Sequence, residues 1–367
     1  MFLNQIEILN FRNYPALKLE FSPRINIIFG KNAQGKTNLL EAVALFSLGR
    51  SFRTKREEEL IRWGSENCFL RGQFESDIGA SLIEIGIGIK EKKIKLNGQN
   101  LNKNEIFSQV PVVIFSPDDL LLIKGGPIYR RDFLDLYLAQ IDPKYRYIYY
   151  NYYKILQQRN RLLKRKGIDF EELEVWNDQL VEKGAKVIKY RLFLIESVKP
   201  FIIEAQGKIS GKKEDLIIEY QSLNKVLTTQ DESEIQYLFS SELKKVRSME
   251  LERGTTLIGP QLDDLNIKMN HGVELKKYGS QGQQRTASLA LKLGLIEKIK
   301  ETRGVYPVLL LDDVMSEFDD HRKQCLIQSL INSVQTFMTS TSRIDFPISP
   351  TEACFFEVRQ GEINHVG

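Results

Sequence analysis

The sequence is poor in cysteine and histidine. Its 367 residues include three cysteines, Cys68, Cys325 and Cys354, which lie far apart and form no CxxC pair. Such spacing gives no sign of a disulfide framework or a zinc ribbon, and it fits a reducing compartment. The three histidines also show no metal-ligand spacing. The residue content therefore points away from structural zinc, disulfide-rich secreted domains and histidine-based metal catalysis.

Long apolar runs are missing as well. No stretch of about eighteen apolar residues occurs, and the first residues lack the basic, apolar and small order of a secretory signal. We therefore expect a cytoplasmic protein without a membrane partner. The net charge of +4 does not by itself predict a polyanion partner, because nucleic-acid binding depends on where basic residues cluster.

The hydrophobic pattern predicts two lobes, and a chain of this length can bury two cores. Strand-like apolar patterns occur at residues 6–11, 17–21, 25–29, 69–96 and 110–115. Apolar residues with helical spacing lie between the third and fourth of these, after Thr37 and up to Gly49. From about Pro127 the pattern is mainly helical, over residues 130–166, 170–209 and 231–252, with one strand at 216–220.

We predict an α/β fold with mixed sheets in which the helical part is an insertion. Residues 1–126 and 253–367 would form one discontinuous domain, and residues 127–252 an inserted, mainly helical lobe. No heptad pattern is sustained over enough length to form a long coiled coil.

A phosphate-binding loop is the strongest local motif. Residues 30–37, GKNAQGKT, match G-x-x-x-x-G-K-[ST] between a buried strand and a helix start. Glycines let backbone N–H groups face phosphates, and the helix adds its positive N-terminal dipole. Lys36 would bridge the β- and γ-phosphates of ATP, and Thr37 would bind Mg²⁺. The alternative is a tight strand-to-helix turn without a ligand. The predicted ATP-binding residues here are Gly30, Lys31, Asn32, Ala33, Gln34, Gly35, Lys36, Thr37 and Asn38.

A second motif places two carboxylates after an apolar strand. Residues 306–311 lead into Asp312 and Asp313, which is the Walker B pattern. Asp312 would bind Mg²⁺ through its water shell, and Asp313 would act as general base with Lys36 as the other catalytic group. Alone, the pattern also suits a strand before a charged turn. Because many ABC and SMC ATPases have glutamate at the second position, we expect hydrolysis slower than the ~10 s⁻¹ typical of enzymes.

A third motif lies between the other two. Residues 278–286, YGSQGQQRT, precede a helical run and resemble the ABC signature. Ser280 is a favourable helix N-cap, so the segment would form a second anion-binding helix start, and an ordinary capped helix is the alternative. In ABC ATPases the signature of one subunit closes over ATP held by the other, which implies the same for Ser280, Gln281, Gly282 and Gln283. Ser316 and Asp319 are similar to a D-loop at such interfaces.

Motifs along the whole chain resemble the RecF family, within the ABC/SMC type of P-loop ATPase head. They are NFRNY at 10–14, GKNAQGKTNLLEA at 30–42, SFRT at 51–54, FSPDD at 115–119, GP at 126–127, RRxFLD at 130–135, GP with DD at 259–264, GSQGQQRT at 279–286 and LLLDDVMSEFD at 309–319. The resemblance adds Arg12 to the expected ATP-binding residues. It also implies a short helical lobe in place of a long coiled-coil arm.

The resemblance implies a function in DNA replication, recombination, repair and the SOS response. The protein would bind double-stranded and gapped DNA as an ATP-dependent homodimer and hydrolyse ATP slowly under DNA stimulation. With RecR and RecO it would help load a RecA-type recombinase at gaps and stalled forks, in a nucleoid-associated location. The chain departs from the family at Gln261 and Leu262, where His-Arg is usual. No Q-loop glutamine is evident, residues 116–119 take that place, and Thr339 and Thr341 follow the strand where transporter ATPases have a switch histidine.

Two basic clusters are candidates for DNA contact. One follows the P-loop helix and includes Arg50 and Arg62, and the other includes Lys154, Arg159, Arg161 and Lys166. The members expected to contact DNA are Arg53, Lys55, Arg56, Lys164 and Arg165. A charge run is more often a solvated helix face, and tyrosines at 145–153 are more often core than base-stacking residues.

Two other functions share some of these motifs. The energising subunit of a transporter would need a docking groove for a membrane protein and normally a switch histidine. A P-loop kinase for a small metabolite would need no signature helix. Each explains less of the chain than an ATP-switched DNA-repair clamp does.

Overall fold

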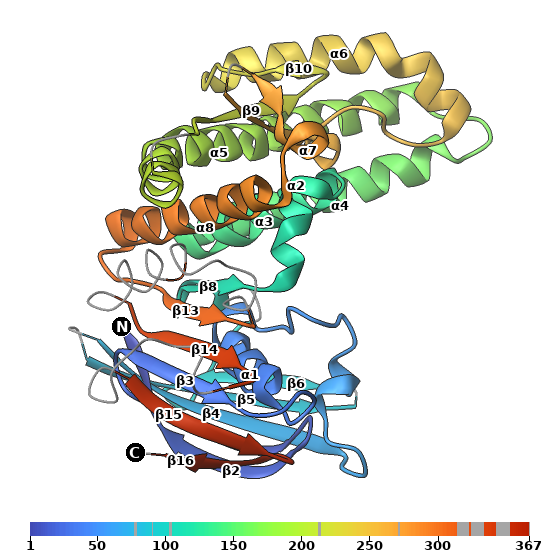
Figure 1. Cartoon of the computed structure of the whole chain (residues 1–367). Coiled ribbons are helices and arrows are strands. Elements are labelled where there is room, and N and C mark those ends of the chain that lie inside the picture. The colour runs from blue at the N-terminus through green and yellow to red at the C-terminus, as the bar shows by residue number, and fades with distance from the viewer. Residues whose placement is uncertain are drawn as a thin grey trace. The chain divides into compact units, whose positions relative to one another are not determined.

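The computed structural model describes residues 1–76, 79–89, 91–102, 105–211, 214–270, 272–313, 323, 334–342 and 353–366. The chain forms two compact units (Figure 1). Met1–Asp118 and Ile296–Gly367 make the first unit, and Asp119–Leu295 make the second. In the described part of the chain, no helix is both long and apolar enough to cross a membrane.

The first unit contains an antiparallel sheet. Its strands alternate between buried and exposed positions, as in β1, where Leu3, Ile6 and Ile8 are fully buried. This alternation is typical of a sheet with one face against the core. The strand order is β2 (Tyr14–Glu20), β1 (Phe2–Phe11), β4 (Asn67–Ser76), β5 (Gly79–Gly88), β6 (Lys92–Leu96) and β7 (Gln99–Asn100).

A second, mostly parallel sheet completes the first unit. Strands β13 and β8 are continuous apolar runs, and nearly every residue of β3 and β14 is buried, which is the pattern expected when both faces of a strand are covered. Because β3, β14 and β13 run parallel, their carboxyl ends lie at one edge of the sheet. The strand order is β16 (Glu362–His365), β15 (Ala353–Arg359), β3 (Ile25–Phe29), β14 (Thr336–Ser340), β13 (Val308–Leu311) and β8 (Val112–Phe115).

Helix α1 (Lys36–Leu48) contacts strands of both sheets in the first unit (Figure 1). The rings of Phe46 and Phe74 meet edge to face, with centroids 5.6 Å apart. Gly49 ends the helix in the left-handed conformation, at φ 59°. The predicted strand, glycine loop and helix are therefore present. Short 3₁₀ turns cover Glu57–Leu60 and Ile106–Ser108, and another, Pro117–Leu120, crosses into the second unit.

The second unit is mainly helical. The prediction of one helical segment over 130–166 was wrong, because the chain breaks at Asp142 and Pro143. Pro143 has no N–H to donate and sits at the first helical position, and the Asp142 carboxylate accepts from the N–H of Lys144 at 2.9 Å. The helices are α2 (Leu121–Lys124), α3 (Pro127–Ile141), α4 (Pro143–Leu163), α5 (Phe170–Ser210), α6 (Glu232–Arg253), α7 (Leu275–Tyr278) and α8 (Gln281–Arg303).

A small sheet in the second unit explains where its boundary falls. The strand order is β10 (Lys225–Val226), β9 (Leu216–Ser222), β11 (Asp264–Met269) and β12 (Val273–Glu274). Since β11 pairs with β9, residues after 253 pack with this unit, whereas the predicted lobe ended at 252. A 3₁₀ turn, Pro260–Leu262, precedes β11. The later boundary falls within α8, so the signature segment belongs to the second unit.

Candidate nucleotide site

Two glycines shape the loop between β3 and α1. Gly30 has φ 152° and Gly35 has φ 121°. A Cβ on Gly30 would lie 2.4 Å from the backbone oxygen of Val358, and a Cβ on Gly35 would lie 2.6 Å from the Asn13 side chain. Larger residues would therefore clash at both positions. Glycine lets the backbone take the tight curve that a phosphate cradle requires.

Lys36 folds back over this loop. Its Nζ donates to the backbone oxygens of Gly30 at 2.6 Å and Lys31 at 2.9 Å. Burial lowers the pKa of the Lys36 amine, while the carboxylates of Asp313 and Asp312 act in the opposite direction. The charged group is thus held beside the loop by carbonyl groups, and phosphate oxygens could replace those acceptors without a change of chain path.

Thr37 and Asp312 meet at the carboxyl edge of the parallel sheet. The Thr37 hydroxyl donates to Oδ1 of Asp312 at 2.8 Å, although 275 residues separate them in sequence. A hydroxyl beside a carboxylate supplies the oxygen ligands that Mg²⁺ prefers. Mg²⁺ commonly takes only one or two protein ligands and completes its shell with phosphate oxygens and water. These two side chains therefore fit the predicted Mg²⁺ site.

Thr339 joins the two carboxylate positions, which sequence reasoning did not predict. Its buried hydroxyl donates to Oδ1 of Asp312 at 2.9 Å and accepts from the backbone N–H of Asp313 at 2.8 Å. Asp313 has φ 53°, a left-handed conformation that is uncommon for residues other than glycine. The hydroxyl thereby contacts the carboxylate of Asp312 and holds the backbone of Asp313 where the chain leaves β13.

Asn13, Tyr14 and Gln360 hold the loop from outside, and their roles were also not predicted. Nδ2 of Asn13 donates to the backbone oxygen of Gln34 at 2.8 Å. The hydroxyl of Tyr14 donates to the backbone oxygen of Gly35 at 2.8 Å. Tyr14 is fully buried, and burial raises the pKa of its phenol. The backbone N–H of Gln360 donates to the Gln34 side chain at 2.6 Å. The protein's own side chains and backbone therefore support the loop.

Arg12, expected among the ATP-binding residues, contacts a buried carboxylate on α1. Its Nε and Nη2 donate to Glu41 at 2.9 and 2.8 Å. The Glu41 side chain is fully buried, and it also accepts from Ser51 and from Arg53. Arg53 further donates to Asn38 at 2.8 Å. Arg12 and Arg53 therefore contact helix α1 through its residue Glu41. A direct contact of Arg12 with ATP stays a prediction.

The signature segment begins helix α8 with a reciprocal cap. The backbone N–H of Gln283 donates to the Ser280 hydroxyl at 3.2 Å, and the Gln283 side chain accepts from the backbone N–H of Ser280 at 2.8 Å. This is the capping-box geometry. Ser280 and Gln281 are exposed, and Gly282 is partly exposed. The helix start is thus available on the surface of the second unit, as a signature that acts on another chain requires.

Asp119, the last of residues 116–119 that were placed at the Q-loop position from sequence, contacts this same helix. The backbone oxygen of Asp119 accepts from the Ser288 hydroxyl at 3.0 Å, and its carboxylate pairs with Lys292. Both partners lie on α8 and are buried. Residues Ser316 and Asp319, predicted as a D-loop, lie outside the described residues.

The paired aspartates at 263–264 have structural partners in the second unit. Asp264 accepts from Nη2 of Arg130 at 3.0 Å. Asp263 accepts from Nη1 of Arg191 at 3.1 Å and from the hydroxyl of Tyr220, and burial raises the pKa of this carboxyl. The two aspartates therefore join residues of α3, α5 and β9 within the second unit. Gln261, at a departure from the family, accepts a hydrogen bond from the hydroxyl of Tyr152.

One member of the second basic cluster is not available to DNA. Arg159 is 1% exposed, and its Nη2 lies 2.6 Å from the equally buried Glu250. The suggestion of a phosphate contact at Arg159 was wrong, because the helix turns this guanidinium into the core. Lys164 and Arg165 are exposed, as are Lys55 and Arg56 of the first cluster. Among the tyrosines of 145–153, Tyr145 and Tyr152 are buried as expected, whereas Tyr147 is 71% exposed.

Comparison with known proteins finds a similar family and similar full-length relatives. A family model described as the RecF/RecN/SMC N terminal domain matches residues 2–349. A DNA replication and repair protein RecF from Halothermothrix orenii is 40% identical over 370 residues, covering 99% of this chain and 98% of that protein. The protein of the same name from Lysinibacillus sphaericus is 39% identical, covering 99% of both.

Solved structures give the same result for the fold. The recombination mediator protein RecF of the RecFOR pathway, solved with ATP, has a TM-score of 0.91 and 38% identity, covering 100% of this chain and 98% of that one. An Smc head domain from Pyrococcus furiosus has a TM-score of 0.57 at 16% identity, covering 100% of this chain and 96% of that one. The predicted α/β fold of the ABC/SMC type is therefore confirmed.

Proposed function

The chain belongs to the RecF/RecN/SMC N-terminal domain family, and from this premise we propose that it is an ATP-switched DNA-repair protein of the RecF type. It binds ATP with Mg²⁺ and closes as a homodimer on double-stranded or gapped DNA. Hydrolysis of ATP then opens the dimer. The single observation that carries this proposal is the meeting of Thr37, Asp312, Thr339 and Asp313 beside the P-loop.

The chemistry follows from the positions of these groups. The loop and Lys36 hold the triphosphate, with Lys36 exchanging its two carbonyl acceptors for phosphate oxygens. Bound Mg²⁺, held by Thr37 and Asp312, would neutralise charge on the β- and γ-phosphates. Asp313 orients the attacking water and accepts its proton. Because its carboxylate is one methylene shorter than glutamate, turnover is slow, and DNA binding accelerates it.

The dimer brings a signature helix start to each P-loop, because the P-loop unit of one chain does not contain this segment. The signature helix start belongs to the second unit and is exposed at Ser280. A helix N-terminus attracts anions through its N–H groups and dipole, so the α8 start of one subunit closes over the γ-phosphate bound by the other. ATP thereby joins two copies, and its loss separates them.

The biological setting follows from the relatives. A RecF of the RecFOR pathway, described as a recombination mediator, is 38% identical to this chain, so RecR and RecO are the proposed protein partners. With them, this protein would help a RecA-type recombinase to load at gaps and stalled forks. Exposed basic residues, including Lys55, Arg56, Lys164 and Arg165, are the proposed phosphate contacts.

The test measures binding to a gapped duplex with ATP, ADP or no nucleotide at several salt concentrations. We expect ATP-dependent binding whose affinity falls by ~10³ or more between 50 and 200 mM salt. Ser280→Arg should bind ATP as a monomer but lose ATP-dependent DNA binding and turnover. Ser248→Arg, at an exposed serine on α6, adds the same charge elsewhere and should keep both. DNA binding that ignores the nucleotide, or full turnover in Ser280→Arg, would overturn the proposal.

A further inference from the structure

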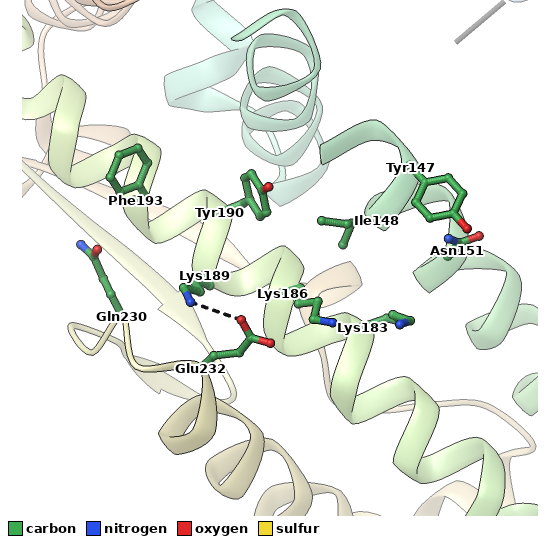
Figure 2. A pocket seen from close by; sticks show the side chains of 10 residues that line it. All are labelled: Tyr147, Ile148, Asn151, Lys183, Lys186, Lys189, Tyr190, Phe193, Gln230 and Glu232. Atoms are coloured by element: carbon green, nitrogen blue, oxygen red, sulfur yellow. Dashed lines mark hydrogen bonds and ion pairs between the residues drawn. The ribbon is translucent and has the colours of Figure 1, made fainter. Parts of the chain in front are cut away.

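A cavity of about 610 Å³ lies in the second unit between α4, α5 and the residues that lead into α6 (Figure 2). One wall is a stripe along α5 that runs from Lys183 to Phe193, and the facing wall comes from α4. Ten residues of helix span ~15 Å, which is the length of four or five extended residues. The cavity therefore has the size and shape of a groove for a short peptide segment.

One end of the groove is aromatic and exposed. Phe193 is 55% exposed, and Tyr190 lies one turn before it on the same face of α5. Tyr147, on α4, is 71% exposed, but Figure 2 places it away from Phe193, on the side of the cavity where Lys183 lies. Figure 2 shows Phe193 and Tyr190 along α5, with Ile148 on the α4 side. Large apolar side chains gathered in a hollow and exposed to water are typical of a binding surface.

The other end of the groove is basic. Lys183 and Lys186 share one carboxylate, Glu182, at 2.7 and 2.9 Å, so this end has one positive charge more than its partner balances. Both lysine side chains are about one-third exposed, so an incoming carboxylate can reach them. In the middle, Lys189 pairs with Glu232 at 3.2 Å. The groove thus has a cationic end and an apolar end.

We propose that this groove binds a short segment of a protein partner that carries carboxylates at one end and a large apolar side chain at the other. The carboxylates pair with Lys183 and Lys186, and the apolar side chain packs on Tyr190 and Phe193. The centres of the two ends lie about seven residues apart on α5, or ~10 Å, which corresponds to three residues of extended peptide.

The lining favours a peptide over a nucleic-acid strand. Glu232 lies in the groove wall beside Lys189, where it would repel a phosphate backbone. An acidic peptide instead needs positive charge only where its carboxylates lie. Along the rest of the groove it needs hydrogen-bond partners for its backbone N–H and C=O groups. The amides of Asn151 and Gln230 face this space and offer both donors and acceptors.

The test uses fluorescein-labelled pentapeptides and fluorescence anisotropy with the full chain. The probe has the order Asp-Asp-Gly-Ser-Phe, made in both sequence directions, and its control replaces both aspartates with asparagine. An eight-nucleotide oligothymidine tests the nucleic-acid alternative. The protein variants are Lys183→Glu with Lys186→Glu, and Phe193→Ala. Lys208→Glu is the matched control, since Lys208 is also on α5 and pairs with Glu204 outside the groove.

We expect one aspartate peptide to bind about tenfold more tightly than its asparagine control, and each groove variant to weaken it by about tenfold. Lys208→Glu should change binding by about twofold or less. Equal binding of both peptides, equal loss in Lys208→Glu, no peptide binding, or groove-dependent binding of oligothymidine alone would overturn the proposal. The measurement contains neither ATP nor DNA, so its failure leaves the proposed nucleotide function untouched.

Discussion

Thr339→Val gives the sharpest test of how the nucleotide site is organised. The substitution keeps the shape of a side chain that is 1% exposed and removes its hydroxyl. Asp312 then loses a donor at 2.9 Å, and the backbone N–H of Asp313 loses an acceptor at 2.8 Å. Since Asp313 is in a left-handed conformation, its backbone loses the hydrogen bond that supports this turn.

The size of the effect can be worked from these two hydrogen bonds. A hydrogen bond to a charged carboxylate is worth ~1.5–3 kcal/mol, and a neutral one ~1 kcal/mol. The two hydrogen bonds together are worth ~2.5–4 kcal/mol. If rather more than half of this energy acts only in the transition state, its loss raises the activation barrier by ~1.4–2.8 kcal/mol, and the rate falls about ten- to hundredfold. The affinity for ATP should change by less than about threefold, because the loop and Lys36 still hold the phosphates.

The assay is single-turnover ATP hydrolysis, with ATP affinity measured in parallel by titration calorimetry. Thr339→Ser is the control, because serine keeps the hydroxyl, and it should stay within about threefold of the parent rate. Thermal unfolding of both variants shows whether the fold is kept. Normal hydrolysis in Thr339→Val, or equal loss in Thr339→Ser, would refute a positioning role for this hydroxyl.

Three further predictions concern other parts of the chain. Tyr14→Phe removes the hydroxyl that donates to Gly35 and should weaken ATP binding about fivefold, measured by calorimetry; an unchanged affinity would show that the loop needs no outer support. Arg159→Met leaves buried Glu250 unpaired and should lower the free energy of unfolding by ~3–5 kcal/mol in urea titrations, with part recovered when Glu250→Met is added; no recovery would contradict a paired-charge origin. Burial lowers the pKa of Lys36 below 10.5, so the folded protein loses this proton at a lower pH than a free lysine does. ATP affinity should therefore fall as the pH rises toward 10.5, while the affinity of Lys36→Arg stays flat. Identical pH profiles for the two proteins would exclude Lys36 as the titrating group.

Much of the nucleotide site could be predicted because its signals are local. Glycine spacing, a lysine and a hydroxyl before an amphipathic helix define a phosphate loop within eight residues, and an apolar run before two aspartates defines a strand that ends in carboxylates. The capping pattern at Ser280 is equally local, and the structure has the predicted helix start there. The break at Asp142 and Pro143 was also readable, since a proline inside a helical pattern marks a boundary.

The tertiary structure alone decided which distant residues share these sites. Sequence patterns contain no information on which side of a strand meets which loop, so Thr339 could be named but not connected to Asp312. Likewise, a basic residue on a helix looks the same whether it faces water or the core, and only packing turned Arg159 toward Glu250. The sequence by itself determined the chemistry of the P-loop and its local shape, because those depend on neighbours along the chain. The support for that loop, the positions of both carboxylates and the groove beside α5 depend on contacts between remote segments, which exist only once the chain has folded.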